Sequence, residues 1–403
     1  MAERPTLSRG VSFWLLTVLF VLLLCAASAP SPLYPVYQAM WGFPASTLTA
    51  IYASYAFGAI SALLVMGRLS DHLGRRPVLL LALVLEVVGM LMFIVADGVT
   101  LLFVGRLVVG VATGIAVGAL SAWLIDLQPP DNPRLGSLLS GVAVILGLGL
   151  GAFVSGVLVQ YAPYPLQLIY WLLAGAYVLA AVGIAVVADP IERRPGWLAS
   201  LRPVVGVPPV ARSMFVAAAP ALVGMWALGG LYLALGPSLA ISILGSDSHV
   251  AGGLLIFALT GTGAVASVLL RRSDPEPMLV RGCVVLIGGV AVTLVGVWLR
   301  STVGLFAGSV LAGIGLGPAF SAYVRTIAPL APPEGRGGLL GAMYLSTYLS
   351  FSVPAVIAGA AVTLYGLRDT TLVYGVAVML LATATTVVVA RRLPELSDRT
   401  SVG

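Results

Sequence analysis

Long apolar segments alternate with short polar ones along the whole 403-residue chain. Twelve of the apolar segments come close to the ~20 residues that an α-helix needs to cross the hydrocarbon core of a bilayer. They cover residues 11–37, 46–66, 77–96, 99–125, 136–160, 165–188, 213–242, 249–270, 278–299, 302–328, 337–364 and 370–390. The pattern predicts an all-α polytopic membrane protein with twelve transmembrane helices.

The composition supports this prediction. Hydrophobic residues make up 60% of the chain and charged residues 9%, whereas about 25% of a soluble domain is charged. The sequence contains no nucleophile elbow, zinc-protease motif, phosphate loop or paired carboxylates, so we expect no enzyme activity and no cofactor. The two histidines, His72 and His249, lie too far apart in the sequence to indicate a metal site.

The basic residues predict the orientation. All 21 are arginines. If both termini are cytoplasmic, nearly all loop arginines face the cytoplasm and only Arg300 and Arg368 face outward, which is the usual bias. We therefore expect a multi-pass protein of the inner (cytoplasmic) membrane of a bacterium. The net charge of +6 then reflects topology and anionic lipids, and no nucleic-acid partner is expected.

The chain repeats itself at an offset of 203 residues, about half its length. The leucine, phenylalanine and glycines of residues 102–114 recur in 305–317, residues 129–131 recur in 332–334, and residues 68–71 recur in 271–274. Six apolar segments separate the copies, so the two halves share one orientation in the membrane. The repeat predicts two parallel six-helix bundles, residues 1–190 and 213–403, joined by a cytoplasmic linker at 191–212.

The charged loop at residues 67–76 reads Gly-Arg-Leu-Ser-Asp-His-Leu-Gly-Arg-Arg. It resembles the loop between the second and third helices of the major facilitator superfamily, with Ser70 in place of an alanine. Together with the two six-helix halves, the resemblance covers essentially the whole chain. It implies the major facilitator fold and a transport function.

The resemblance implies that Asp71 and Arg75 form a latch between the halves on the cytoplasmic side. Asp126, at the cytoplasmic end of the fourth helix, lies within predicted reach of Arg75. We therefore predict a chain of charges from Asp71 through Arg75 to Asp126, which is worth a few kcal/mol only where it is partly buried. The other latch positions are Gly67, Gly74 and Arg76.

Arg106 matches the buried arginine of the superfamily's fourth-helix motif. Proton-coupled members often pair it with an acid on the first helix, which is missing here. The only carboxylate near mid-membrane is Glu86, whose depth differs from that of Arg106 by only ~3 Å at the helical rise of ~1.5 Å per residue. We predict that Glu86 pairs with Arg106 and carries the proton; the alternative is a purely structural glutamate.

The fifth helix carries closely spaced small residues, among them Gly147, Gly151 and Gly156. They resemble the antiporter signature Gly-x-x-x-Gly-Pro-x-x-Gly-Gly, with Ala152 for the proline and Ser155 for a glycine. Small residues let helices approach closely, which would suit an interface between the halves.

A candidate substrate surface is mostly aromatic, and such linings suit amphipathic molecules better than sugars. Its predicted members are Tyr34, Tyr37, Gln38, Tyr52, Tyr55, Trp226, Tyr232, Tyr344 and Tyr348. We expect a monomeric secondary transporter that works by alternating access and exports small amphipathic drugs or metabolites, with the proton gradient as its energy source. The alternatives are an importer or uniporter of a small metabolite, or a lipid flippase of the same fold.

Overall fold

Every regular element in the computed structural model is helical among the residues that it describes, which are 7–67, 69–189, 197–201, 203, 205–245, 248–332 and 336–400. Twelve helical spans are long and apolar enough to cross a membrane, from Arg9–Trp41 to Leu367–Arg391. The prediction of an all-α polytopic protein with twelve transmembrane helices is confirmed.

The chain divides into two compact units. Unit 1 comprises residues 1–43 and 50–204, and unit 2 comprises 44–49 and 205–403. The boundary between residues 204 and 205 falls inside the predicted linker, whereas residues 44–49, from the predicted first bundle, group with unit 2. Three sequence features lie wholly or partly outside the described residues: Arg68, residues 191–196, 202 and 204 of the linker, and residues 333–334 of the second-half repeat.

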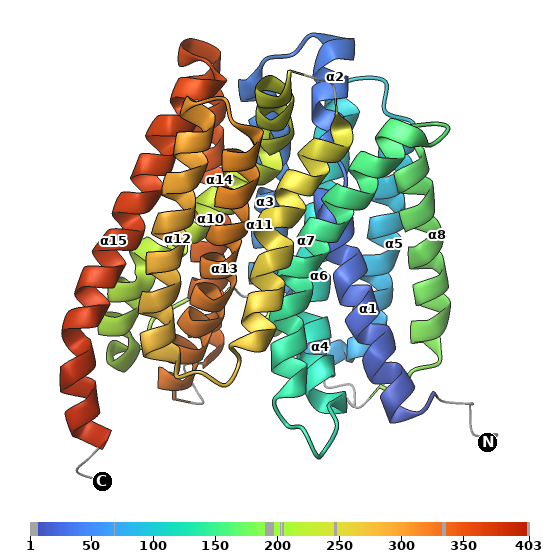
Figure 1. Cartoon of the computed structure of the whole chain (residues 1–403). Coiled ribbons are helices and arrows are strands. Elements are labelled where there is room, and N and C mark those ends of the chain that lie inside the picture. Colours follow the sequence, from blue (N-terminus) through green and yellow to red (C-terminus); the bar gives the residue numbers. More distant parts are fainter. Residues whose placement is uncertain are drawn as a thin grey trace. The chain divides into compact units, whose positions relative to one another are not determined.

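The helices of the first half lie in the blue to green part of Figure 1. They are α1 (Arg9–Ser28), η1 (Ser31–Leu33), α2 (Tyr34–Trp41), α3 (Ala45–Met66), α4 (Ser70–Leu73), α5 (Arg75–Ile94), α6 (Val99–Leu127), α7 (Leu135–Tyr161), α8 (Leu168–Ala185) and α9 (Trp197–Ser200). The first span is interrupted after Ser28, where Pro30 and Pro32 lack the backbone N–H groups that would continue α1.

The helices of the second half follow in yellow-green to red. They are α10 (Pro209–Leu244), α11 (His249–Leu269), α12 (Pro275–Trp298), α13 (Thr302–Ile327), η2 (Ala328–Leu330), α14 (Arg336–Tyr365) and α15 (Leu367–Thr400).

The sequence repeat corresponds to a repeated packing contact. In unit 1, a methyl group added to Gly110 of α6 would overlap the carbonyl oxygen of Tyr55 on α3. In unit 2, a methyl group on Gly313 of α13 would overlap the carbonyl oxygen of Leu259 on α11. Glycine permits this close helix approach in both units.

The small residues of α7 pack against α1 of the same bundle. A side chain on Gly147 would meet Val21 and Leu24, and one on Gly151 would overlap the carbonyl oxygen of Cys25. Gly156 is also buried. The close contact that Gly147 and Gly151 make possible therefore holds α7 against α1 within unit 1, and the role of these glycines between the halves stays a prediction.

This contact predicts different effects for two alanine substitutions in α7. Gly151→Ala should lower the free energy of unfolding by about 1–3 kcal/mol, because the added methyl group has no room. Gly141→Ala, at a position with open space around it, should be neutral or stabilising by up to about 1 kcal/mol, because alanine favours the helix. Thermal unfolding of the purified protein in detergent measures both, and equal midpoints would contradict the contact.

Candidate functional site

Arg106 lies inside unit 1 and is completely buried. Its Nη1 donates a hydrogen bond to the carbonyl oxygen of Ala27 on α1, at 2.6 Å. Three tyrosine rings surround the guanidinium, with ring centroids 4.9 Å (Tyr52), 5.0 Å (Tyr55) and 5.9 Å (Tyr34) from Cζ. Cation–π attraction of this kind is strongest where water is excluded. Three predicted cavity tyrosines are thus brought together around the buried arginine.

The proline-rich end of the first span supplies the oxygen acceptors. Because the helical hydrogen bonding of α1 stops after Ser28, backbone carbonyls there lack their usual helical partners. The oxygen of Ala27 accepts from Arg106, and that of Ala29 accepts from Ser155 Oγ on α7 at 2.6 Å. Two side chains from other helices therefore occupy the freed carbonyls, Arg106 from α6 and Ser155 from α7.

Glu86, on α5, is also completely buried. Its Oε1 accepts a hydrogen bond from Thr113 Oγ1 of α6 at 3.0 Å. The predicted ion pair between Glu86 and Arg106 is wrong: within the part of the chain that the structure describes, the two side chains form neither a salt bridge nor a hydrogen bond with each other. Glu86 is hydrogen-bonded to Thr113 instead, and Arg106 to the carbonyl oxygen of Ala27.

Several buried polar atoms of this region have no hydrogen-bond partner among the described residues. They are Nε and Nη2 of Arg106, Oε2 of Glu86, the hydroxyl oxygen of Tyr34 and Oγ of Ser31. A buried polar atom without a partner costs roughly 1–3 kcal/mol, more when it is charged. These atoms therefore mark a region of unit 1 that can offer both donors and acceptors to a bound solute or proton. We call Arg106, Glu86, Tyr34, Tyr52 and Tyr55 the Arg106 cluster.

The other predicted cavity residues do not join this cluster. Tyr37 stacks on Trp41 and its hydroxyl lies 3.4 Å from that of Tyr170, while Gln38 donates to the carbonyl oxygen of Phe43. In unit 2, Trp226 packs edge-on against Phe320 and Phe351, the Tyr232 hydroxyl pairs with Ser309 at 2.8 Å, and Tyr344 and Tyr348 are half-buried. Ser309 occupies the repeat position of Arg106, so each half places a polar group there.

The structure contains the predicted chain of charges on the loop before α5. Arg75 Nε lies 2.8 Å from a carboxylate oxygen of Asp126, and Nη1 lies 3.5 Å from one of Asp71. The exposed fractions of the side chains are 8% for Arg75, 33% for Asp126 and 58% for Asp71. Because screening by solvent weakens exposed pairs, the bond to Asp126 is the stronger of the two.

The sequence reasoning missed Asp189, just beyond the end of α8. Its two carboxylate oxygens accept hydrogen bonds from the backbone N–H groups of Arg75 (3.2 Å) and Arg76 (3.0 Å), the first residues of α5. An anion is favoured there by the helix dipole. Arg76 Nη1 also donates to the carbonyl oxygen of Ala185, so among the described residues one hydrogen bond to the last residue of α8 and two to Asp189 attach the start of α5 to this end of α8.

Gly74 makes this attachment possible. Its φ of +95° lies in the region that favours glycine, and an added methyl group would press against the Asp189 carboxylate. Gly67, at the other end of the motif, donates its N–H to the carbonyl oxygen of Leu63 as α3 ends. Gly74 is therefore required by its backbone conformation, and Gly67 because a Cβ there would overlap the carbonyl oxygen of Leu63.

The fold and these sites define a class of protein: a two-unit helical membrane protein with charged groups buried in one bundle and an ion-pair network at a loop. A model of the Major Facilitator Superfamily matches residues 16–353. The chain belongs to the Major Facilitator Superfamily, and it is a transporter of that family.

Its relatives differ in what they carry. Over 149 residues it is 30% identical to the glucose transporter GlcP of Staphylococcus epidermidis, which covers 37% of this chain and 32% of that protein. Over 130 residues it is 26% identical to the quinolone resistance protein NorA of Staphylococcus aureus, covering 31% and 34%. The matches thus span about a third of the length of these relatives.

Solved structures resemble the chain over nearly its whole length. The human organic anion transporter MFSD10 superposes with a TM-score of 0.67 at 19% identity, covering 92% of this chain and 98% of that one. The nucleoside transporter NupG gives a TM-score of 0.70 at 14% identity, covering 93% and 99%. At these identities the likeness shows the fold, and the prediction of the major facilitator fold is confirmed.

The ion-pair geometry predicts unequal effects at the two carboxylates. Asp126→Asn should lower the free energy of unfolding by about 1.5–3 kcal/mol, because it weakens a charge-assisted hydrogen bond to a buried arginine. Asp71→Asn should cost less than about 1 kcal/mol, because that pair is exposed and longer. Chemical unfolding of both variants in detergent measures the difference; the opposite order would contradict the assignment.

The Asp189 contact predicts coupling with Gly74. Gly74→Ala should destabilise the protein by about 1–3 kcal/mol through backbone strain and contact with the carboxylate. Asp189→Ala should also destabilise it, because two N–H groups lose their acceptor. In the double variant the clash disappears, so its destabilisation should be smaller than the sum of the two single effects. Strict additivity in a double-mutant cycle of unfolding free energies would contradict the proposed contact.

Proposed function

We propose that this transporter exports small amphipathic molecules in exchange for protons, by alternating access of a central site to the two sides of the membrane. The observation that carries the proposal is the Arg106 cluster, in which a buried arginine and a buried glutamate lie in one bundle but are not paired with each other. Buried ionisable groups in a membrane protein indicate function by default.

The chemistry of the cluster supports an amphipathic substrate. The rings of Tyr34, Tyr52 and Tyr55 offer apolar faces, while Nε and Nη2 of Arg106 are donors without partners among the described residues. A solute with an aromatic or apolar body and a hydrogen-bond acceptor would satisfy both features. The likeness to the quinolone resistance protein NorA supports export of this kind of molecule.

Glu86 is the group we assign to the proton. It is completely buried, and Thr113 satisfies only one of its two carboxyl oxygens. The second oxygen, which has no partner among the described residues, could bind a proton. Because Arg106 and Glu86 interact electrostatically, protonation of Glu86 would change the electrostatic potential at the proposed solute site. Protonation of Glu86 would make the cluster more positive, so proton binding and the binding of a cationic solute would oppose each other through the low dielectric of the bundle, as exchange requires.

The latch is the part we assign to switching. Arg75 lies between Asp71 and Asp126, and Asp189 attaches the start of α5 to the end of α8. Such a network can hold a loop in one arrangement and release it when the helices move. We expect the chain to act as a monomer in the cytoplasmic membrane of a bacterium, with both termini in the cytoplasm.

An importer or uniporter of a small metabolite is the second candidate, supported by the likeness to the glucose transporter GlcP. Against it, the Arg106 cluster offers fewer polar side chains than a sugar with many hydroxyls would need. A flippase is the third candidate, since a buried arginine could also hold a phosphate headgroup. Counter-flow assayed with a labelled sugar and with a labelled amphiphile separates the first two by the solute that exchanges, and copurifying lipid lost in Arg106→Ala would indicate the third.

The decisive experiment compares the wild type with Glu86→Gln and Thr113→Val in liposomes under an imposed pH gradient. The probes are a panel of cationic and neutral amphiphiles. Glutamine keeps an oxygen that can accept the Thr113 hydrogen bond but cannot titrate, whereas Thr113→Val removes the bond and keeps the acid. We expect gradient-driven uptake by the wild type and by Thr113→Val, and its loss in Glu86→Gln with counter-flow exchange retained.

Other outcomes would reassign the residues. Gradient-driven uptake that persists in Glu86→Gln would return Glu86 to a structural role. Transport by the wild type that ignores the pH gradient would indicate facilitated diffusion. Loss of both uptake and counter-flow in Glu86→Gln, with an unchanged unfolding midpoint, would place Glu86 in solute binding and remove it from proton coupling.

A further inference from the structure

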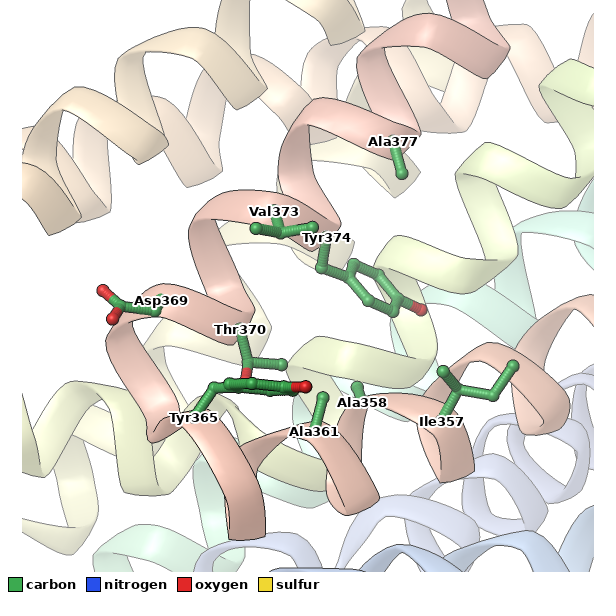
Figure 2. Close-up of a pocket in the computed structure, with 9 residues that line it drawn as sticks. All are labelled: Ile357, Ala358, Ala361, Tyr365, Asp369, Thr370, Val373, Tyr374 and Ala377. Atoms are coloured by element: carbon green, nitrogen blue, oxygen red, sulfur yellow. The ribbon is translucent and has the colours of Figure 1, made fainter.

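A cavity of about 520 Å³ lies in unit 2 between the ends of α14 and α15. It is bounded by residues 357–365 of α14 and 369–377 of α15, and we call it the α14/α15 groove (Figure 2). The volume is within the range of about 300–1,000 Å³ that is typical of small-molecule sites. Ala358, Ala361 and Ala377 leave this space because their side chains end at Cβ.

The surroundings of the groove face lipid. Ile357, Tyr365 and Val373 line it and are 63%, 71% and 72% exposed. Side chains this large and apolar, exposed on a membrane-spanning helix, contact acyl chains. An occupant of the groove would therefore enter from the bilayer, and its tail would be apolar.

Two polar groups lie at the end of the groove where the spans terminate. Thr370 is 6% exposed, and its hydroxyl oxygen has no hydrogen-bond partner among the described residues. Asp369, in the first turn of α15, is exposed at this end and forms no ion pair within the described part of the chain. A buried hydroxyl without a partner is an independent sign that something polar binds beside the carboxylate.

The neighbouring positive charge is engaged elsewhere. Arg368 donates to the carbonyl oxygen of Trp298 at 2.9 Å, and its Cζ lies 4.9 Å from the centroid of the Trp298 ring. Among the residues that line the groove, the charge is therefore the single negative one of Asp369. Charge complementarity favours an occupant with a cationic head.

We propose that the α14/α15 groove binds a phospholipid with a primary ammonium headgroup, phosphatidylethanolamine. An acyl chain lies against the alanines, the ammonium donates to Asp369, and Thr370 donates its hydroxyl to an ester or phosphate oxygen. A primary ammonium has three N–H donors for the carboxylate, whereas the quaternary choline headgroup has none. The proposal does not depend on which solute the protein transports.

Photocrosslinking of the full-length protein in nanodiscs tests this. The probes are phosphatidylethanolamine and phosphatidylcholine carrying the same photoreactive acyl chain, and the readout is the labelling of peptides that cover residues 357–377. In the wild type we expect phosphatidylethanolamine to label these peptides about threefold or more above phosphatidylcholine, the ratio that even a modest ion pair gives. Asp369→Asn should remove the preference.

The matched control is Asp97→Asn, which removes an exposed carboxylate from the turn between α5 and α6 in unit 1. It should leave the preference intact. Ala361→Leu, which fills the groove, should reduce labelling by both lipids while the unfolding midpoint stays near that of the wild type. Equal labelling by the two lipids in the wild type, or an equal loss in Asp97→Asn, would overturn the proposal. So would displacement of both lipids by a soluble amphipathic amine at concentrations that leave other labelled sites unchanged.

Discussion

A guanidinium buried inside a helix bundle needs oxygen acceptors or aromatic faces, because little water is available to replace them. Arg106 meets this constraint with the carbonyl oxygen of Ala27 and the rings of Tyr34, Tyr52 and Tyr55. The carbonyl is available because prolines end the regular helix of the first span. The break in α1 and the tyrosines of α2 and α3 thus supply the groups that surround this one buried charge.

The same requirement explains the small residues of the first bundle. Ser155 reaches the carbonyl oxygen of Ala29 because α7 approaches α1 closely at Gly147 and Gly151. The interruption of α1 is thus stabilised from two sides, by a hydroxyl from α7 and by a guanidinium from α6. The residues of α7 that resemble an antiporter signature therefore have a structural role within the bundle. The glycines allow α7 to pack closely against α1, and Ser155 donates a hydrogen bond to the end of α1.

Much of this arrangement could be predicted from the sequence. Twelve helices follow from apolar length, and the link of Arg75 to Asp71 and Asp126 follows from loop position and opposite charge. Asp189 was missed because it acts through backbone N–H groups, which leave no trace in the pattern of side chains. A carboxylate just beyond a span end, together with a glycine before the next helix, is the signal that could have indicated it.

The predicted pairing of Glu86 with Arg106 failed for an instructive reason. Equal depth along two helices fixes the height of two side chains but not the faces from which they project. Thr113 lies nearer to Glu86, and Ala27 nearer to Arg106, so each charge is solvated locally. Because Glu86 and Arg106 are not paired, each keeps side-chain atoms without a hydrogen-bond partner among the described residues. In an ion pair these atoms would be bonded to each other. In the exchange mechanism proposed above, the field between the two groups would couple protonation of the glutamate to solute binding without direct contact.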